Sequence, residues 1–267
     1  MDYKIVFSDI DGTLLNKDRE LSPATIDAVK SLSNKIPFIL ISARMPAAMR
    51  HLQEELEIGH LPIIAYNGGL IIVDGKTTLS TEIPLEVVEE LSRMNEFKCH
   101  LSLYHRDEWY VPQSDKWALR EINNTKVIPV VRSNDQVIKK WDREEKGAHK
   151  IMAMGEIEQI DTIRDYLEEK YPGQLHLYRS KDTYLEIAPS SISKFTAIEM
   201  LLKEHFHLSP KEAVAIGDNY NDIEMLRKVG YGVAVGNARQ EAMDAANIVC
   251  GKSIEDGVAK LLVKIFK

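Results

Sequence analysis

The sequence predicts an α/β protein: a Rossmann-like parallel sheet with helices on both faces, plus an inserted α+β domain. Apolar runs of strand length alternate with helical patterns up to about residue 70. The same alternation resumes after about residue 190, whereas the segment between mixes strand pairs and helices. We therefore expect a core domain of residues 1–80 and 190–267 and an inserted cap domain of residues 81–189.

The first flank opens with an apolar run at residues 4–8, which is typical of a buried strand. Ser22 and Pro23 predict a helix start, because serine caps well and proline suits the first helical position. Ile26, Val29 and Leu32 would share one face of that helix. The remaining expectations are strands at 38–41 and 63–66, a helix over 45–56 between them, and a hairpin over 70–83.

The second flank continues the sheet, which should total roughly six strands. A helix is expected at 194–204, strands at 213–216, 232–235 and 248–250, helices at 222–229 and 239–246, and a terminal helix from Asp256. Ligands of such sheets bind beyond the carboxyl ends of the strands.

The inserted segment has weaker patterns. A helix is expected around residue 88, strand pairs near 99–112, a helix near 157–170 and paired strands near 175–187. Four polar residues on or near these hairpins either face the core domain or form a solvated surface: His105, Arg106, Tyr184 and Glu186.

Composition excludes several classes of protein. The net charge of -7 gives no basic footprint for nucleic acid. The two cysteines, Cys99 and Cys250, have no metal-type spacing, so reduced thiols are expected rather than a disulfide framework or a zinc site. No apolar run reaches membrane-spanning length and no secretion signal is seen, so the cytoplasm is expected. The sequence leaves the oligomeric state open between a monomer and a small homo-oligomer.

Two carboxylates follow the first strand at a spacing of two. Asp9 and Asp11 leave an extended chain on the same side, and two such charges are tolerated mainly with a cation between them or with one protonated. The alternative is a strand that runs into a solvated Asp-Gly turn.

Four clusters at strand ends or a helix start carry the remaining signal: residues 9–13, Ser42, Lys194 and residues 217–222. In order and type they resemble the four motifs of the haloacid dehalogenase superfamily of phosphotransferases. The long insert and Asn67-Gly68-Gly69 resemble its Cof-type, sugar-phosphatase-like branch with a type II cap.

The resemblance implies roles for the acidic residues. Asp9 would attack phosphorus and form an aspartyl phosphate, and Asp11 would protonate the leaving oxygen and then activate water. Mg²⁺ suits an all-oxygen site and would be held by Asp9, the backbone carbonyl of Asp11 and Asp218. Asp222 would act on the metal or its waters, although a simple helix cap also explains it.

The resemblance also implies donors for the phosphoryl group. Lys194 would hold charge and orient Asp9. The other expected phosphate or substrate contacts are Ile10, Thr13, Ser42, Ala43, Arg44 and Asn221. Two of the side chains at the site mouth have plain alternatives: Arg44 as a surface arginine, and Asn67 as a turn residue.

Two positions depart from the family pattern, which has glycine at both. Ala43 would crowd the phosphate if its backbone needed a positive φ, and Phe195 could pack under the cap instead.

The expected function is a magnesium-dependent phosphatase that hydrolyses small phosphorylated metabolites, either sugar phosphates or phosphorylated cofactors. The alternatives are a phosphomutase of the same superfamily and a non-catalytic protein that binds such metabolites.

Overall fold

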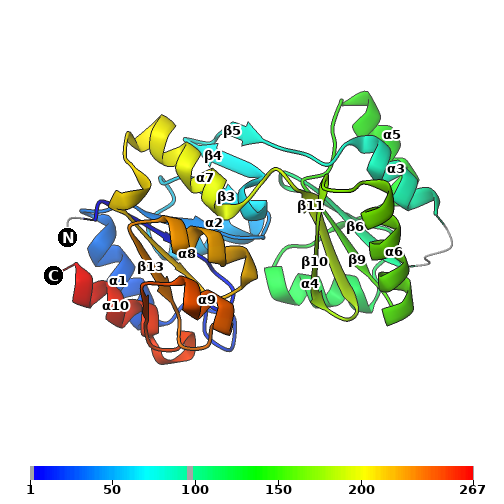
Figure 1. Cartoon of the computed structure of the whole chain (residues 1–267). Coiled ribbons are helices and arrows are strands. Elements are labelled where there is room, and N and C mark those ends of the chain that lie inside the picture. Colours follow the sequence, from blue (N-terminus) through cyan, green and yellow to red (C-terminus); the bar gives the residue numbers. More distant parts are fainter. Residues whose placement is uncertain (1–2, 95–98, 267) are drawn as a thin grey trace. The chain divides into compact units, whose positions relative to one another are not determined.

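The computed structural model describes residues 3–94 and 99–266, in two compact units (Figure 1). The core unit comprises residues 1–79 and 193–267, and the inserted unit comprises residues 80–192. The predicted domain ranges also include residues 1–2, 95–98 and 267, which lie outside the described residues. Within the described ranges, no helix combines the length and apolar character needed to cross a membrane.

The core unit is built on an eight-stranded sheet in the order β14-β13-β12-β1-β2-β3-β4-β5. The six strands from β14 to β3 are parallel, which confirms the expected Rossmann-like core, and β4 runs antiparallel to β3. The strands are β1 (Ile5–Ser8), β2 (Phe38–Ile41), β3 (Ile63–Ala65), β4 (Leu70–Val73), β5 (Lys76–Ser80), β12 (Ala213–Gly217), β13 (Tyr231–Ala234) and β14 (Ile248–Val249).

Helices cover both faces of this sheet. The helices are α1 (Pro23–Ser33), α2 (Ala47–Glu55), α7 (Lys194–Leu201), α8 (Ile223–Lys228), α9 (Gln240–Ala245) and α10 (Gly257–Ile265). Ile5 and Phe7 of β1 point into the apolar cluster that α7, α8 and α9 share, so the intervening Val6 points to the other face. α10 packs against α1, which brings helices from both ends of the chain together (Figure 1).

The helix boundaries follow the capping signals closely. Ser22 accepts a hydrogen bond from the Thr25 amide and Pro23 opens α1, as expected. The predicted helix from Lys194 also starts at that residue, but it ends in a π-helical turn over Leu202–Phe206. The helix expected from Asp222 begins one residue later, after a short 3₁₀ turn over Tyr220–Asp222.

The inserted unit has its own six-stranded sheet, in the order β10-β11-β9-β6-β7-β8. Neighbouring strands are antiparallel except for β7 and β8. The strands are β6 (His100–His105), β7 (Glu108–Val111), β8 (Val130–Val131), β9 (Lys150–Met154), β10 (Leu175–Lys181) and β11 (Tyr184–Pro189). Strands β8 and β9 were not predicted.

Among the described residues of the inserted unit, a large apolar cluster lies between this sheet and three helices. α3 (Leu85–Arg93), α5 (Asn134–Arg143) and α6 (Ile157–Lys170) supply its helical side. α4 (Lys116–Thr125) contacts the opposite face, where Trp117 lies edge-on to the Tyr184 ring. α4 and α5 were not predicted, although Val137, Ile138 and Trp141 have the spacing of one buried helix face in α5.

Candidate active site

Parallel pairing brings the two acidic motifs together. β1 lies between β12 and β2, and Ser8 is opposite Ile216 in the register. The Asp9 amide donates to the Ile216 carbonyl at 2.9 Å, so Asp9 and Gly217 leave neighbouring strands at the same sheet edge. About two hundred residues of sequence therefore separate groups that share one site.

Lys194 is the centre of the site. Its Nζ lies 2.5 Å from Asp9 Oδ1 and 2.6 Å from Asp222 Oδ1, and all three side chains are buried. Ser193 caps α7 by accepting from the Thr196 amide, which fixes Lys194 as the first helical residue. The predicted role of Lys194 in orienting Asp9 thus has a direct contact in its support.

Three carboxylates converge against this single lysine. Asp9, Asp218 and Asp222 each have one oxygen within 4.8 Å of the others. Burial raises the pKa of Asp9 well above its ordinary value, Lys194 offsets this only in part, and the charges of Asp222 and Asp218 raise the pKa further. Burial and the charge of Asp222 raise the pKa of Asp218 to about 6. The site therefore carries excess negative charge, and its all-oxygen donor set fits a hard divalent cation such as Mg²⁺.

The Asp218 loop is held by its own neighbours. Asp222 Oδ2 accepts from the amides of Asp218 and Asn219 at 2.9 and 3.0 Å, while Oδ1 accepts from Lys194. Thr13 Oγ1 donates to Asp218 Oδ1 at 3.0 Å, so its hydroxyl is directed at a carboxylate in this structure. Both Asp222 and Thr13 therefore position Asp218. Asp222 occupies the N-cap position of α8 but makes no side-chain cap hydrogen bond there; its carboxylate instead closes the capping box of the 3₁₀ turn that follows Asn219.

Two glycines permit close approaches at the site. Gly12 has φ +83°, and a Cβ there would lie 2.4 Å from Asp218 Oδ2. Gly68 has φ +103°, and a Cβ there would lie 2.5 Å from the Ser193 carbonyl, beside the start of α7. Asn237, which sequence reasoning missed, donates to the Gly12 carbonyl at 2.7 Å and carries no motif that would reveal it.

Asp11 lies apart from the buried cluster and is held by Arg44. Arg44 donates through Nε and Nη2 to both carboxylate oxygens of Asp11 at 2.7 Å, and through Nη1 to the Ala48 carbonyl. Burial acts to raise the pKa of Asp11, but the hydrogen bonds and charge of Arg44 prevail and lower it. The Arg44 side chain is 7% exposed, so it is not the surface arginine considered as the alternative.

The remaining predicted residues line the neighbouring strand ends. Ser42 is buried, with its Oγ accepting from the Arg44 amide at 3.2 Å, and Ile10 is buried at the turn after β1. Asn221 Nδ2 donates to Asn67 Oδ1 at 2.9 Å. Asn67 has φ +55° and also donates its amide to the Ser42 carbonyl, so it both makes the turn and contacts the motif residues.

The two departures from the family pattern have structural answers. Ala43 is absent from the described residues with positive φ, so its backbone does not need a glycine. Phe195 packs in the apolar cluster of the core unit, with Lys228 Nζ 4.7 Å from its ring centre. The suggestion that Phe195 packs under the cap is therefore wrong, because its position in α7 points it at the core sheet.

For two cap residues, the solvated-surface alternative is wrong. His105 and Tyr184 are 3% and 4% exposed, so neither belongs to a solvated face. Each packs on other rings of the inserted unit, His105 against Trp141 and Tyr184 against Trp117.

Comparison with known proteins decides the family. The model of the haloacid dehalogenase-like hydrolases matches residues 6–262. The chain belongs to this family. A Haemophilus influenzae protein that carries a phosphatase name is 35% identical over 100% of this chain and 99% of its own length. The hydrolase assignment and the expected phosphatase class are thus confirmed.

Other relatives carry more specific names. A Bacillus subtilis 5-amino-6-(5-phospho-D-ribitylamino)uracil phosphatase is 28% identical over 98% of this chain and 95% of its own length. A haloacid dehalogenase-like hydrolase from Bacteroides thetaiotaomicron has a TM-score of 0.88 at 26% identity, covering 99% of this chain and 100% of its own. A subclass IIB sugar phosphatase, at 23% identity, TM-score 0.81 and coverage of 98% and 99%, has the same fold.

Proposed function

We propose that the protein is a magnesium-dependent phosphatase that hydrolyses small phosphorylated metabolites through an aspartyl phosphate on Asp9. The observation that carries this proposal is the buried cluster in which Lys194 bridges Asp9 and Asp222 and Asp218 lies within reach of both. A purely structural cluster would not need three carboxylates at one lysine, because each unpaired buried charge is costly.

Asp9, the backbone carbonyl of Asp11 and Asp218 would hold the Mg²⁺ ion. When bound, the ion supplies positive charge that lets a carboxylate approach a phosphate ester. Asp222 contributes indirectly, since its two oxygens already engage Lys194 and the amides of the Asp218 loop. Its proposed role is to fix the lysine and Asp218 in place.

In the first step, a carboxylate oxygen of Asp9 forms a bond to phosphorus and the ester oxygen leaves with a proton from Asp11. Water, deprotonated by Asp11, then attacks phosphorus of the aspartyl phosphate and releases phosphate and free Asp9. Lys194 keeps Asp9 oriented through both steps, while Ser42, Asn221 and the amides near Ile10 and Ala43 donate to the phosphoryl oxygens.

The Arg44 contact sets a condition on this scheme. Asp11 can donate a proton only after its carboxylate leaves the paired contact with Arg44. Arg44 then regains two donors, which would suit a second anionic or hydroxyl group of the substrate. We propose that substrate binding causes Arg44 to exchange Asp11 for this substrate group.

The substrate class is supported by the relatives, whose names include phosphatases of a ribitylaminouracil phosphate and of HMP-PP. A phosphorylated cofactor, a cofactor precursor or a sugar phosphate fits the same site chemistry. A phosphomutase would share Asp9 but return the phosphoryl group to the substrate, so its product is an isomer and not free phosphate.

The test is release of inorganic phosphate from phosphorylated metabolites and a generic phenyl phosphate ester, with and without Mg²⁺. Asp9→Asn should lower kcat at least about 10³-fold, because the nucleophile is lost. Asp27→Asn, an exposed change in α1, is the matched control. Substantial turnover by the Asp9 variant would remove the nucleophile assignment, and binding without turnover by the native protein would favour a non-catalytic role.

A further inference from the structure

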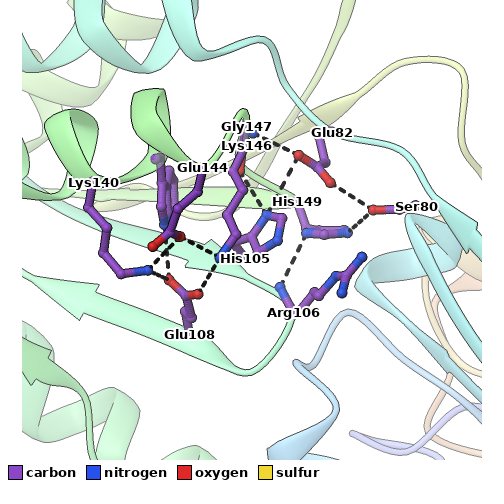
Figure 2. Close-up of polar contacts among 11 residues, drawn as sticks. Ser80, Glu82, His105, Arg106, Glu108, Lys140, Glu144, Lys146, Gly147 and His149 are labelled. Carbon is purple, nitrogen blue, oxygen red and sulfur yellow. Dashed lines mark hydrogen bonds and ion pairs between the residues drawn. The ribbon is translucent and has the colours of Figure 1, made fainter. Parts of the chain in front are cut away.

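Three ligand-type side chains outside the proposed active site meet in the inserted unit (Figure 2). Glu82, His105 and His149 each have one donor atom within 4.8 Å of the others. His105 and His149 are 3% and 0% exposed, and Glu82 is half-buried. Nothing in the proposed phosphatase chemistry uses this group.

The strand pairing makes the cluster rigid. His105 ends β6, and His149 directly precedes β9, which pairs with β6. The His149 amide donates to the Tyr104 carbonyl at 2.8 Å, and Ile83, next to Glu82, forms a bridge with Ala148. Three separate chain segments are thereby held together by backbone hydrogen bonds, which suits a metal site better than a loop would.

Neighbouring groups orient the donors. Glu82 Oε2 accepts from the Gly147 amide and Oε1 from the Ser80 hydroxyl, both at 2.7 Å. His105 Nδ1 donates to the Gly147 carbonyl at 3.0 Å (Figure 2). Such contacts from a backbone carbonyl to an imidazole and from donors to a carboxylate are typical around bound metals.

A cavity of about 450 Å³ borders the cluster at Glu82. Glu82 and Gly147 lie in its wall, whereas His105 and His149 do not. Its other charged lining residues are Glu86, Glu89, Asp142, Glu145 and Lys146, so acidic groups outnumber basic ones. This excess of negative charge attracts cations to the Glu82 side of the cluster.

We propose that Glu82, His105 and His149 form a Zn²⁺ site in the inserted unit. Mixed imidazole and carboxylate donors favour Zn²⁺ over Mg²⁺, and a water or the Ser80 hydroxyl would complete four ligands. His149 Nε2 lies 3.0 Å from Ser80 Oγ, and the Arg106 amide donates to His149 Nδ1 at 3.3 Å, so the neutral ring carries its proton on Nε2 in this arrangement. For Nε2 to bind the ion, that proton moves to Nδ1 and the Arg106 amide contact is lost. The proposal departs from the expectation that a zinc site is disfavoured, because that expectation considered only cysteine spacing and this site has no cysteine.

The test is titration of the metal-free full chain with Zn²⁺, followed by calorimetry and metal analysis in excess Mg²⁺, which occupies the carboxylate site of the core unit. We expect one equivalent of Zn²⁺ to bind. Glu82→Gln and His149→Gln should each weaken this binding at least about 10-fold, since each removes a ligand. His60→Gln, an exposed change in the core unit, should leave it unchanged.

Co²⁺ absorption of the unmutated protein provides a readout that does not depend on how the variants fold. Intense visible bands of a four-coordinate ion, abolished by added Zn²⁺, would support the site. Absence of both these bands and Zn²⁺ binding would overturn the proposal, as would equal Zn²⁺ affinity in native protein and the folded Glu82 variant. Phosphatase activity is not a readout here, so this outcome is separate from the fate of the proposed function.

Discussion

The two clusters of ligand-type residues differ in their net charge and in how far hydrogen bonds within the protein compensate it. The core unit gathers three carboxylates around Lys194, and its acids have raised pKa values. The inserted unit pairs two neutral histidines with Glu82, whose pKa is lowered by hydrogen bonds. The first cluster is strained without a cation, whereas the second is satisfied by its own hydrogen bonds. The core cluster should therefore respond more strongly to mutation, pH and metal.

The largest expected effect comes from removing the positive charge of Lys194 from the core cluster. Lys194→Met leaves Asp9 and Asp222 buried and facing each other, so we expect the free energy of unfolding to fall by about 3–5 kcal/mol. Activity should fall at least about 10²-fold. Urea unfolding and phosphate release measure the two effects.

Lys146→Met in the inserted unit is the matched comparison. Lys146 pairs with Glu108 at 2.7 Å and is 26% exposed, so we expect a loss of at most about 1 kcal/mol. Similar losses for Lys194→Met and Lys146→Met would remove the contrast between the two units.

The next largest effect should come from adding a side chain at Gly68, where two backbone segments of the core unit lie close together. Gly68→Ala places a methyl group 2.5 Å from the Ser193 carbonyl at φ +103°, and we expect about 2–4 kcal/mol of destabilisation with reduced activity. Gly75→Ala also has positive φ but meets nothing within 4 Å, so about 1 kcal/mol is expected. Thermal unfolding compares them, and equal losses would show that the contact with α7 is unimportant.

The pH dependence of metal-free protein should reveal the charge excess. The pKa of Asp218 in the folded protein is raised to about 6 from an ordinary value of 3.8. The stability that protonated Asp218 contributes is therefore fully present below about pH 4 and is lost as the pH rises through 6. We expect this to cost on the order of 1–3 kcal/mol of stability. Mg²⁺ should restore stability at pH 7.5 and have little effect at pH 4.5. A Mg²⁺ effect in urea unfolding that does not vary with pH would contradict this.

The smallest expected effect concerns Glu108 of the inserted unit, whose pKa is lowered on folding whereas that of Asp218 is raised. Burial acts to raise the pKa of Glu108, but hydrogen bonds from Lys146, Trp141 and Lys140 lower it to about 2. Its contribution is present above about pH 4.5 and lost as pH falls toward 2. Glu108→Gln should therefore cost about 1 kcal/mol at pH 7 and nothing near pH 2. Hydrogen exchange of α5 amides across this range would measure it, and an unchanged profile would exclude the contact.

Most of the core sheet could be predicted from the sequence because its strands are apolar and end in recognisable polar motifs. Asp9 and Asp218 follow apolar strands, so local patterns revealed them, whereas Lys194 was identified only by its place in the motif order of the family. The pairing of Arg44 with Asp11 could not be predicted, because it depends on how the loop after β2 turns back.

The inserted unit was harder to predict for physical reasons. α4 and α5 are polar helices with few buried residues, and β9 is a short strand with apolar residues on both faces. Glu82, His105 and His149 have no motif spacing, since sheet pairing alone brings them together. Phe195 was misplaced because the family pattern says nothing about which face of α7 a larger residue takes.

The position of β1 in the sheet has a consequence for biosynthesis. Its partner β12 begins at Ala213, so the edge of β1 at Ile5–Ser8 has no such neighbour while about two hundred further residues leave the ribosome. At typical translation speeds this interval lasts roughly 10–40 s. The β12-facing edge of this apolar strand must be protected throughout that time, and chaperone demand should therefore centre on Ile5–Ser8.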